Sequence, residues 1–157
     1  MIEERLLELG IELPPAAAPV ASYVPVRIAG GLAFVAGQVP LEDGKVLLSG
    51  AVDSDVTVEQ AQEAARRCAL QALAALSEAL DGLDRVIGIA QLAVYVASAP
   101  GFTDQPTVAN GASDVLVEIF GEEGRHARAA VGVAELPLGA SVEVAVTALI
   151  APGPQTS

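Results

Sequence analysis

The segment from Thr57 to Gly82 constrains the fold more than any other part of this sequence. Thr57 and Gln60 stand three residues apart ahead of an apolar run, the pattern of a capping box that satisfies free backbone N–H groups. Small residues and leucines then recur at helical spacing: Ala61, Ala64, Ala65, Cys68, Leu73, Leu76 and Leu80. Gly82 is the expected stop. An alanine-rich stripe of this length predicts a long helix that packs closely on a sheet.

Apolar runs with the character of strands lie on both sides of this helix. The strands are expected within residues 24–39, 85–97, 127–133 and 141–150. The first of these stretches is interrupted by Gly30-Gly31, which predicts a hairpin. A second helix is expected over residues 106–120, ending at Gly121.

The remaining segments are shorter. Residues 2–9 predict a short amphipathic helix that ends at Gly10, followed by a Pro/Ala linker that cannot form regular helix. The polar, Gly-containing stretch over residues 41–55 predicts a loop with room for a short strand. The chain is expected to form one domain over residues 1–157, with its core at about 23–150, the extra helix and linker at 1–22, and a tail at 151–157.

The order ββ-α-β-α-ββ predicts an α+β fold, with a mixed sheet that carries two main helices on one face and an extra N-terminal helix. The other face of the sheet then needs cover, and oligomerisation provides it. Cys68 falls among alanines and leucines, which predicts a buried packing residue.

Composition excludes several function classes. The formal net charge is −12 with only eight basic residues, too few and too scattered for a nucleic-acid track. No stretch reaches the roughly 18 apolar residues that a membrane span requires, and the acidic N-terminus lacks a signal-peptide pattern, so a cytoplasmic protein is expected. Motifs for a metal site and for a phosphate-binding loop are absent from the sequence, so no metal site is expected.

Two charged residues stand out because each shares its strand face with small side chains. Arg128 alternates with Ala130 and Gly132, and Glu143 alternates with Ser141, Ala145 and Thr147. Such a face leaves unfilled volume, where a charge needs a partner, a ligand or water; a rim salt bridge or a solvated charge is the alternative interpretation. In a simple hairpin around Pro137-Leu138 the two residues would lie about 13–17 Å apart, so a site that contains both is expected between subunits.

Two motifs resemble the RidA/YjgF family, also described as L-PSP endoribonuclease-like. One runs from Arg128 through a valine-containing strand to Leu136-Pro137 and then Val142-Glu143-Val144; the other is Tyr23 followed by Ala36-Gly37-Gln38-Val39-Pro40. The resemblance covers residues from about 23 to 150, and the extra N-terminal helix is similar to a longer, less characterised branch. It implies a chorismate-mutase-like fold, a homotrimer with clefts between subunits, and chemistry that needs no cofactor.

The resemblance also implies residue roles. Arg128 matches the arginine that holds the substrate carboxylate, and Glu143 the acidic residue that positions or activates water. Tyr23, Ala36 and Gly37 match the pocket lining, although the family often has serine where Ala36 stands. The usual asparagine of the second helix has no unambiguous counterpart around Asn110 and Ser113.

Three classes of function remain. The first is hydrolytic deamination of enamine or imine intermediates, of the 2-aminoacrylate or 2-imino acid type, to 2-keto acids and ammonia. The second is a non-catalytic trimeric binding protein for small carboxylate metabolites. Ribonuclease activity is disfavoured by the acidic charge and the single histidine. That histidine, His126, has two interpretations: it caps or packs locally, or it lines the mouth of the cleft.

Overall fold

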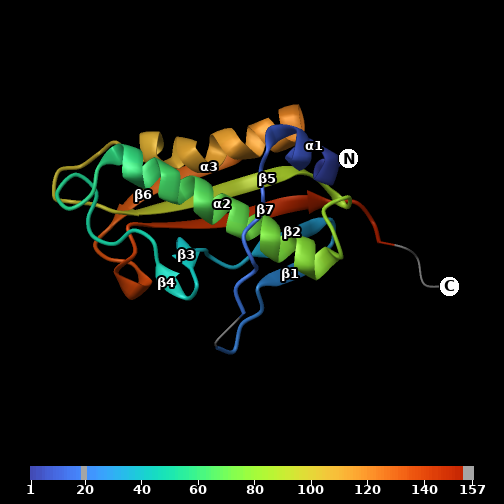
Figure 1. Ribbon diagram of the computed structural model, residues 1–157, viewed down its shortest axis with the longest axis horizontal. Helices are drawn as coiled ribbons and strands as arrows, with labels where there is room; N and C mark the ends of the chain where they lie inside the picture. The colour runs from blue at the N-terminus through green and yellow to red at the C-terminus, as the bar shows by residue number, and fades with distance from the viewer. Residues whose placement is uncertain (19–20, 154–157) are drawn as a thin grey trace.

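The computed structural model describes residues 1–18 and 21–153, and it is built on a five-stranded sheet covered by helices on one face (Figure 1). The sheet order is β1-β2-β7-β5-β6, in which only β5 and β6 are parallel. These strands are β1 (Val26–Ala29), β2 (Leu32–Val35), β5 (Val86–Ala97), β6 (Ala127–Val133) and β7 (Val142–Ile150). The fold is the expected α+β arrangement of a mixed sheet with two main helices. The predicted linker and tail include residues 19–20 and 154–157, which lie outside the described residues.

Helix α2 (Val58–Leu80) forms as its sequence predicts. The Thr57 hydroxyl accepts a hydrogen bond from the Gln60 N–H at 3.1 Å, and the Gln60 side chain accepts one from the Thr57 N–H at 2.9 Å. The helix ends at Leu80 because Asp81 takes a left-handed conformation with φ of 56°. Cys68 is fully buried on the helix, as predicted, and this burial raises the pKa of its thiol.

Helix α3 (Gln105–Phe120) runs beside α2 across the same face of the sheet (Figure 1). The two helices approach so closely that a Cβ atom at Gly111 would collide with the backbone of Gln62. Helix α1 (Ile2–Leu9) packs at one end of this layer, where Arg5 donates a hydrogen bond to the Glu118 carbonyl at 3.2 Å. Among the described residues, no helix is long and apolar enough to cross a membrane.

Short elements complete the chain. The β1–β2 hairpin turns at Gly30, whose φ of 59° suits glycine, and the predicted loop contains a small ribbon of β3 (Leu41–Glu42) and β4 (Lys45–Val46). Two 3-10 helices, η1 (Gly121–Gly124) and η2 (Pro137–Gly139), precede β6 and β7.

The supposed hairpin between the last two strands is wrong. Strand β5 lies between β6 and β7, because α3 carries the chain over the sheet so that β6 pairs in parallel with the outer edge of β5. Arg128 therefore stands in a row with Leu92 and Val146, both buried beneath the helices. Glu143 stands in a row with Tyr95 and Val131, three sheet positions further along and on the opposite face. The hairpin-based separation of these two charges no longer applies.

The helix-free face of the sheet carries exposed apolar side chains. Phe34, Val131 and Leu149 are each between 37% and 45% exposed. Strand β6 forms the edge of the sheet, so its outer backbone groups have no strand partner within the described chain. An apolar sheet face beside a free edge is suited to contact with another subunit.

Candidate functional site

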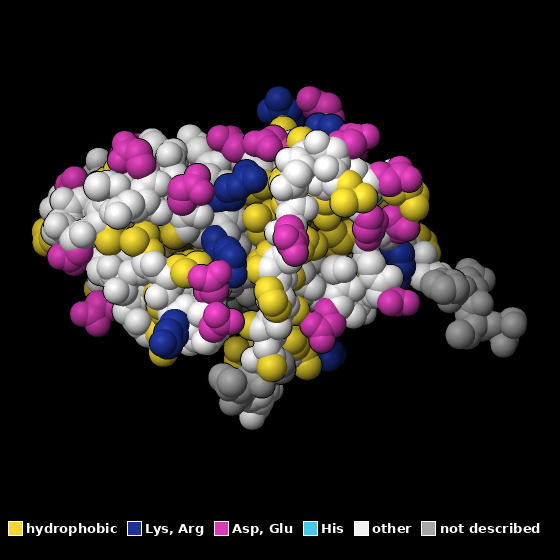
Figure 2. Space-filling view, in the orientation of Figure 1, with side chains coloured by type: hydrophobic (Ala, Val, Ile, Leu, Met, Phe, Trp, Pro, Cys, Tyr) yellow, Lys and Arg dark blue, Asp and Glu magenta, His cyan; other side chains and the backbone are white. Residues whose placement is uncertain are grey.

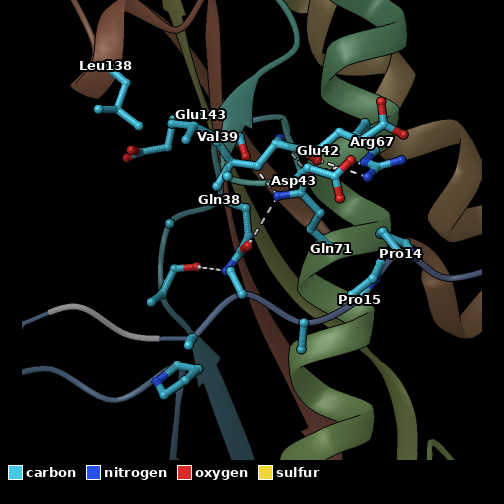
Figure 3. A pocket seen from close by; sticks show the side chains of 18 of the residues that line it. Pro14, Pro15, Gln38, Val39, Glu42, Asp43, Arg67, Gln71, Leu138 and Glu143 are labelled. Carbon is cyan, nitrogen blue, oxygen red and sulfur yellow. Dashed lines mark hydrogen bonds between the residues drawn. The ribbon is translucent and has the colours of Figure 1, made fainter.

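An open cleft of about 1080 Å³ lies against the start of β7, and four of the five predicted site residues line it. These four are Tyr23, Ala36, Gly37 and Glu143. The linker over residues 12–18 and the segment over residues 36–44 form its walls, and η2 contributes Pro137 and Leu138. Figure 3 shows this cleft at close range, with Glu143 directed toward Leu138.

Glu143 is the candidate acid–base group of the cleft. It projects from β7 on the helix-free face and is half-buried, and this burial raises the pKa of its carboxyl. It makes no ion pair with any described residue. A carboxylate without a counter-ion in such a site is a stronger base than a free one and is available to a water molecule or a substrate.

Gly37 allows the Glu143 carboxylate to lie against the backbone. A Cβ atom at position 37 would stand 2.8 Å from Oε2 of Glu143 and 3.0 Å from its Cδ. The neighbouring Gln38 ties this wall to β7 through paired backbone hydrogen bonds with Val144, at 2.8 and 2.9 Å. The wall and the carboxylate therefore have a fixed relation to one another.

Gln71 on α2 anchors the same wall from the other side. Its side chain is 4% exposed; it donates to the Val39 carbonyl at 2.7 Å and accepts from the Leu41 N–H at 2.9 Å. Arg67, one turn earlier, donates to the Leu41 carbonyl at 2.9 Å. Figure 3 shows Arg67 and Glu143 pointing to different sides of the segment that carries Gln38 and Val39. Sequence reasoning missed Gln71, although one amide within an apolar helix stripe signals a buried polar contact.

Arg128 does not line this cleft. It projects from the edge strand β6 toward α3, where its Nη1 donates to Asn110 Oδ1 at 2.8 Å and to Ser113 Oγ at 3.1 Å. Ion pairs within the described chain join only Met1 to Glu4, Arg5 to Glu8, and Arg125 to Glu122. The rim salt bridge considered for Arg128 is thus not found there, and its exposed guanidinium is held by neutral partners alone.

Asn110 and Ser113, whose match to the second helix of the family is ambiguous in the sequence, both contact Arg128 in the structure. They stand three residues apart on α3, so both face the same side of the helix and reach the same guanidinium. His126 lies beside them, with Nε2 at 2.9 Å from Ser113 Oγ and Nδ1 at 2.6 Å from the Gly124 carbonyl oxygen. The histidine makes these local contacts two residues before Arg128.

The described residues hold no group of three or more His, Cys, Asp or Glu side chains placed to bind a metal ion. On the face drawn in Figure 2, acidic side chains are spread widely and the few basic ones form no continuous track among the residues in colour. The charged side chains that line the cleft are Glu143, whose carboxyl pKa is raised, and Glu12, Glu42, Asp43 and Arg67, whereas the Arg128 guanidinium lies outside it.

The sheet order and its helix layer define a protein of the chorismate-mutase-like α+β class. A family described as "YjgF/chorismate_mutase-like, putative endoribonuclease" matches residues 3–150. The chain belongs to this family, YjgF/RidA, whose members are often deaminases and are typically trimeric.

Individual relatives place the chain in a divergent branch of the family. Protein TCP17 of Trypanosoma cruzi is 49% identical over 144 residues, which cover 91% of this chain and 90% of the relative. Atu1372 from Agrobacterium tumefaciens, a protein of unknown function, is 47% identical in sequence to this chain. Its structure matches this one with a TM-score of 0.87 over 96% of this chain and 92% of that one. A "putative endoribonuclease" from Shewanella oneidensis is 35% identical with a TM-score of 0.90, covering 96% and 99%.

Proposed function

We propose that this protein hydrolyses small enamine or imine intermediates that bear a carboxylate, releasing a 2-keto acid and ammonia at sites formed between subunits. The observation that carries the proposal is the placement of Arg128 and Glu143. Each lacks a counter-ion within the described chain, and the two point to opposite faces of the sheet. One subunit cannot direct both at one small molecule, whereas two neighbouring subunits can.

A closed ring of subunits supports this assembly. In a cyclic oligomer each interface joins one surface of a subunit to a different surface of the next. The exposed edge of β6, with Arg128 beside it, is one surface, and the helix-free face with Glu143 is the other. Contact between them would cover the apolar face and bring a guanidinium to the mouth of the cleft.

The proposed reaction needs only Arg128, Glu143, the substrate and a water molecule. Arg128 binds the substrate carboxylate through its free N–H groups and so fixes the imine carbon in place. Glu143 accepts a proton from water while the water oxygen bonds to that carbon, giving a carbinolamine. The nitrogen gains a proton, the carbon–nitrogen bond breaks, and the hydroxyl loses a proton to leave the ketone. Imine and water are thus converted to 2-keto acid and ammonia.

Release of 2-keto acid from 2-iminopropionate, generated in place by an amino-acid oxidase, tests the proposal. Wild type should accelerate release over buffer, and Arg128→Ala should lose that acceleration while remaining folded and oligomeric. Arg125→Ala is the matched control, because Arg125 is an exposed arginine paired with Glu122 and should leave the rate unchanged. No acceleration by a folded wild-type oligomer would contradict the proposal.

A second function is favoured by one specific feature, the alanine at position 36. Ala36 lines the cleft without a hydroxyl that could hold a reacting group. A trimeric protein that binds carboxylate metabolites without turnover is compatible with this wall. Pyruvate binding by wild type, together with no acceleration of imine hydrolysis, would identify this function.

A further inference from the structure

We infer that Ser113 and His126 are positioning residues that preorganise Arg128 for carboxylate binding. The inference rests on the proposed role of Arg128 as the carboxylate anchor. It concerns a chain of hydrogen bonds outside the cleft that contains Glu143. The chain runs from Arg128 Nη1 to Ser113 Oγ at 3.1 Å, from Ser113 Oγ to His126 Nε2 at 2.9 Å, and from His126 Nδ1 to the Gly124 carbonyl at 2.6 Å.

With His126 in its neutral form, the two ends of this chain determine the direction of every bond in it. A guanidinium can only donate and a carbonyl oxygen can only accept. Nδ1 of His126 therefore donates to Gly124, and Nε2 of the neutral ring accepts the hydroxyl proton of Ser113. With its proton committed to His126, Ser113 directs a lone pair at Arg128. Each donor then has one acceptor, and no rotor in the chain is free.

This arrangement matters because Arg128 is exposed on an edge strand. An arginine side chain has about 2 kcal/mol of rotamer entropy to lose, and a ligand that orders it loses affinity accordingly. Asn110 and Ser113 together hold Nη1, while Nε and Nη2 make no hydrogen bond within the described chain. The remaining N–H groups of the planar guanidinium are then presented in a fixed orientation, as a bidentate contact with a carboxylate requires.

The supports of the histidine are themselves rigid. Gly124 is buried at the end of η1, and its backbone lies so close to α3 that a Cβ atom there would stand 2.5 Å from the Leu116 carbonyl oxygen. Ser113 lies on α3 and His126 lies immediately before β6. The chain therefore joins three elements at the point where Arg128 leaves the sheet.

Affinity for pyruvate, the product-like 2-keto acid, measures the effect without requiring turnover. Ser113→Ala and His126→Phe should each weaken binding about tenfold, as expected for loss of a hydrogen bond that supports a charged group. The double variant should be little weaker than either single one, because both changes break the same chain. In imine hydrolysis the same variants should raise KM with little change in kcat.

Two further substitutions separate positioning from local packing. His126→Gln places an amide atom near the position of Nε2 and can still accept from Ser113, whereas His126→Asn reproduces only the contact of Nδ1 with Gly124. Positioning of Arg128 predicts that His126→Gln retains most of the pyruvate affinity and His126→Asn does not. The reverse order would overturn the inference, as would wild-type affinity in both Ser113→Ala and His126→Phe.

The outcome for wild type distinguishes this inference from the function on which it rests. Wild type that binds pyruvate, with variants that bind equally well, removes the role of Ser113 and His126 but leaves Arg128 as the anchor. Wild type that binds no carboxylate removes both. Circular dichroism and the oligomeric mass of each variant establish that a lost affinity does not come from unfolding.

Discussion

Glu143 and Gly37 are fitted to one another at the scale of single atoms. The carboxylate occupies the space that a side chain at position 37 would need, and burial raises its pKa. Arg128 has the opposite environment: it is exposed, and hydrogen-bonded to Asn110 and Ser113 rather than to a carboxylate. We propose that these environments suit the two groups to different tasks, the carboxyl to proton transfer and the guanidinium to binding an anion.

Gly37→Ala should displace the carboxylate without unfolding the chain. The added Cβ would meet Oε2 of Glu143 at 2.8 Å, and the end of a flexible side chain can move aside. Because catalysis is sensitive to displacements of about 1 Å, kcat for imine hydrolysis should fall about 10- to 100-fold. Gly31→Ala is the control, since its Cβ would meet only the Ile150 carbonyl, at 3.8 Å. Equal rates for both variants would contradict the role of Gly37.

At the scale of elements, α2 provides both the core and the anchor of the cleft wall. Its capping box fixes where the helix starts, and Gln71 and Arg67 then meet the segment that carries Val39 and Leu41. A substitution that weakens the start of α2 is therefore expected to lower the stability of the whole helix layer.

Thr57→Ala should destabilise the protein by about 1 kcal/mol, the usual contribution of an N-cap side chain. The midpoint of thermal unfolding should fall by about 2–4 °C for a chain of this size. The unfolding midpoint of Thr57→Ser should fall much less, because serine retains the hydroxyl that accepts a hydrogen bond from the Gln60 N–H. An equal fall in both variants would show that the hydroxyl is not what stabilises the helix.

Local signals in the sequence predicted the elements well. The capping box, the Gly30-Gly31 turn and the apolar stripes each act over a few residues, and α2, the first hairpin and β5 match their predicted positions closely. The pairing of β6 was missed because it depends on a distant partner. The strand–helix–strand order of β5, α3 and β6 does indicate a parallel pair, but the short connection between β6 and β7 suggested a hairpin instead.

The candidate site was predictable to the same extent. Arg128 and Glu143 stood out because each alternates with small residues, and the family resemblance supplied Tyr23 and the Ala36-Gly37 wall. The contacts of Asn110 and His126 could not be read in advance, since they depend on how α3 turns over the end of β6.

At the scale of the whole molecule, two surfaces of one chain expose groups that a second subunit could cover or pair with. The helix-free face exposes apolar side chains beside Glu143, and the β6 edge exposes backbone groups beside Arg128. Family members are typically trimeric, and a three-fold ring would pair these surfaces around the molecule. We propose that a complete site takes its guanidinium from one subunit and its carboxylate from the next.

Mixing two inactive variants tests this claim most directly. Arg128→Ala and Glu143→Gln chains would be denatured together in equal amounts, refolded into mixed oligomers, and assayed for 2-keto acid release. In random cyclic mixtures about a quarter of the interfaces pair an intact Arg128 with an intact Glu143, so about a quarter of the wild-type activity should return. No recovery, from mixtures shown to contain both chains in one oligomer, would contradict a site shared between subunits.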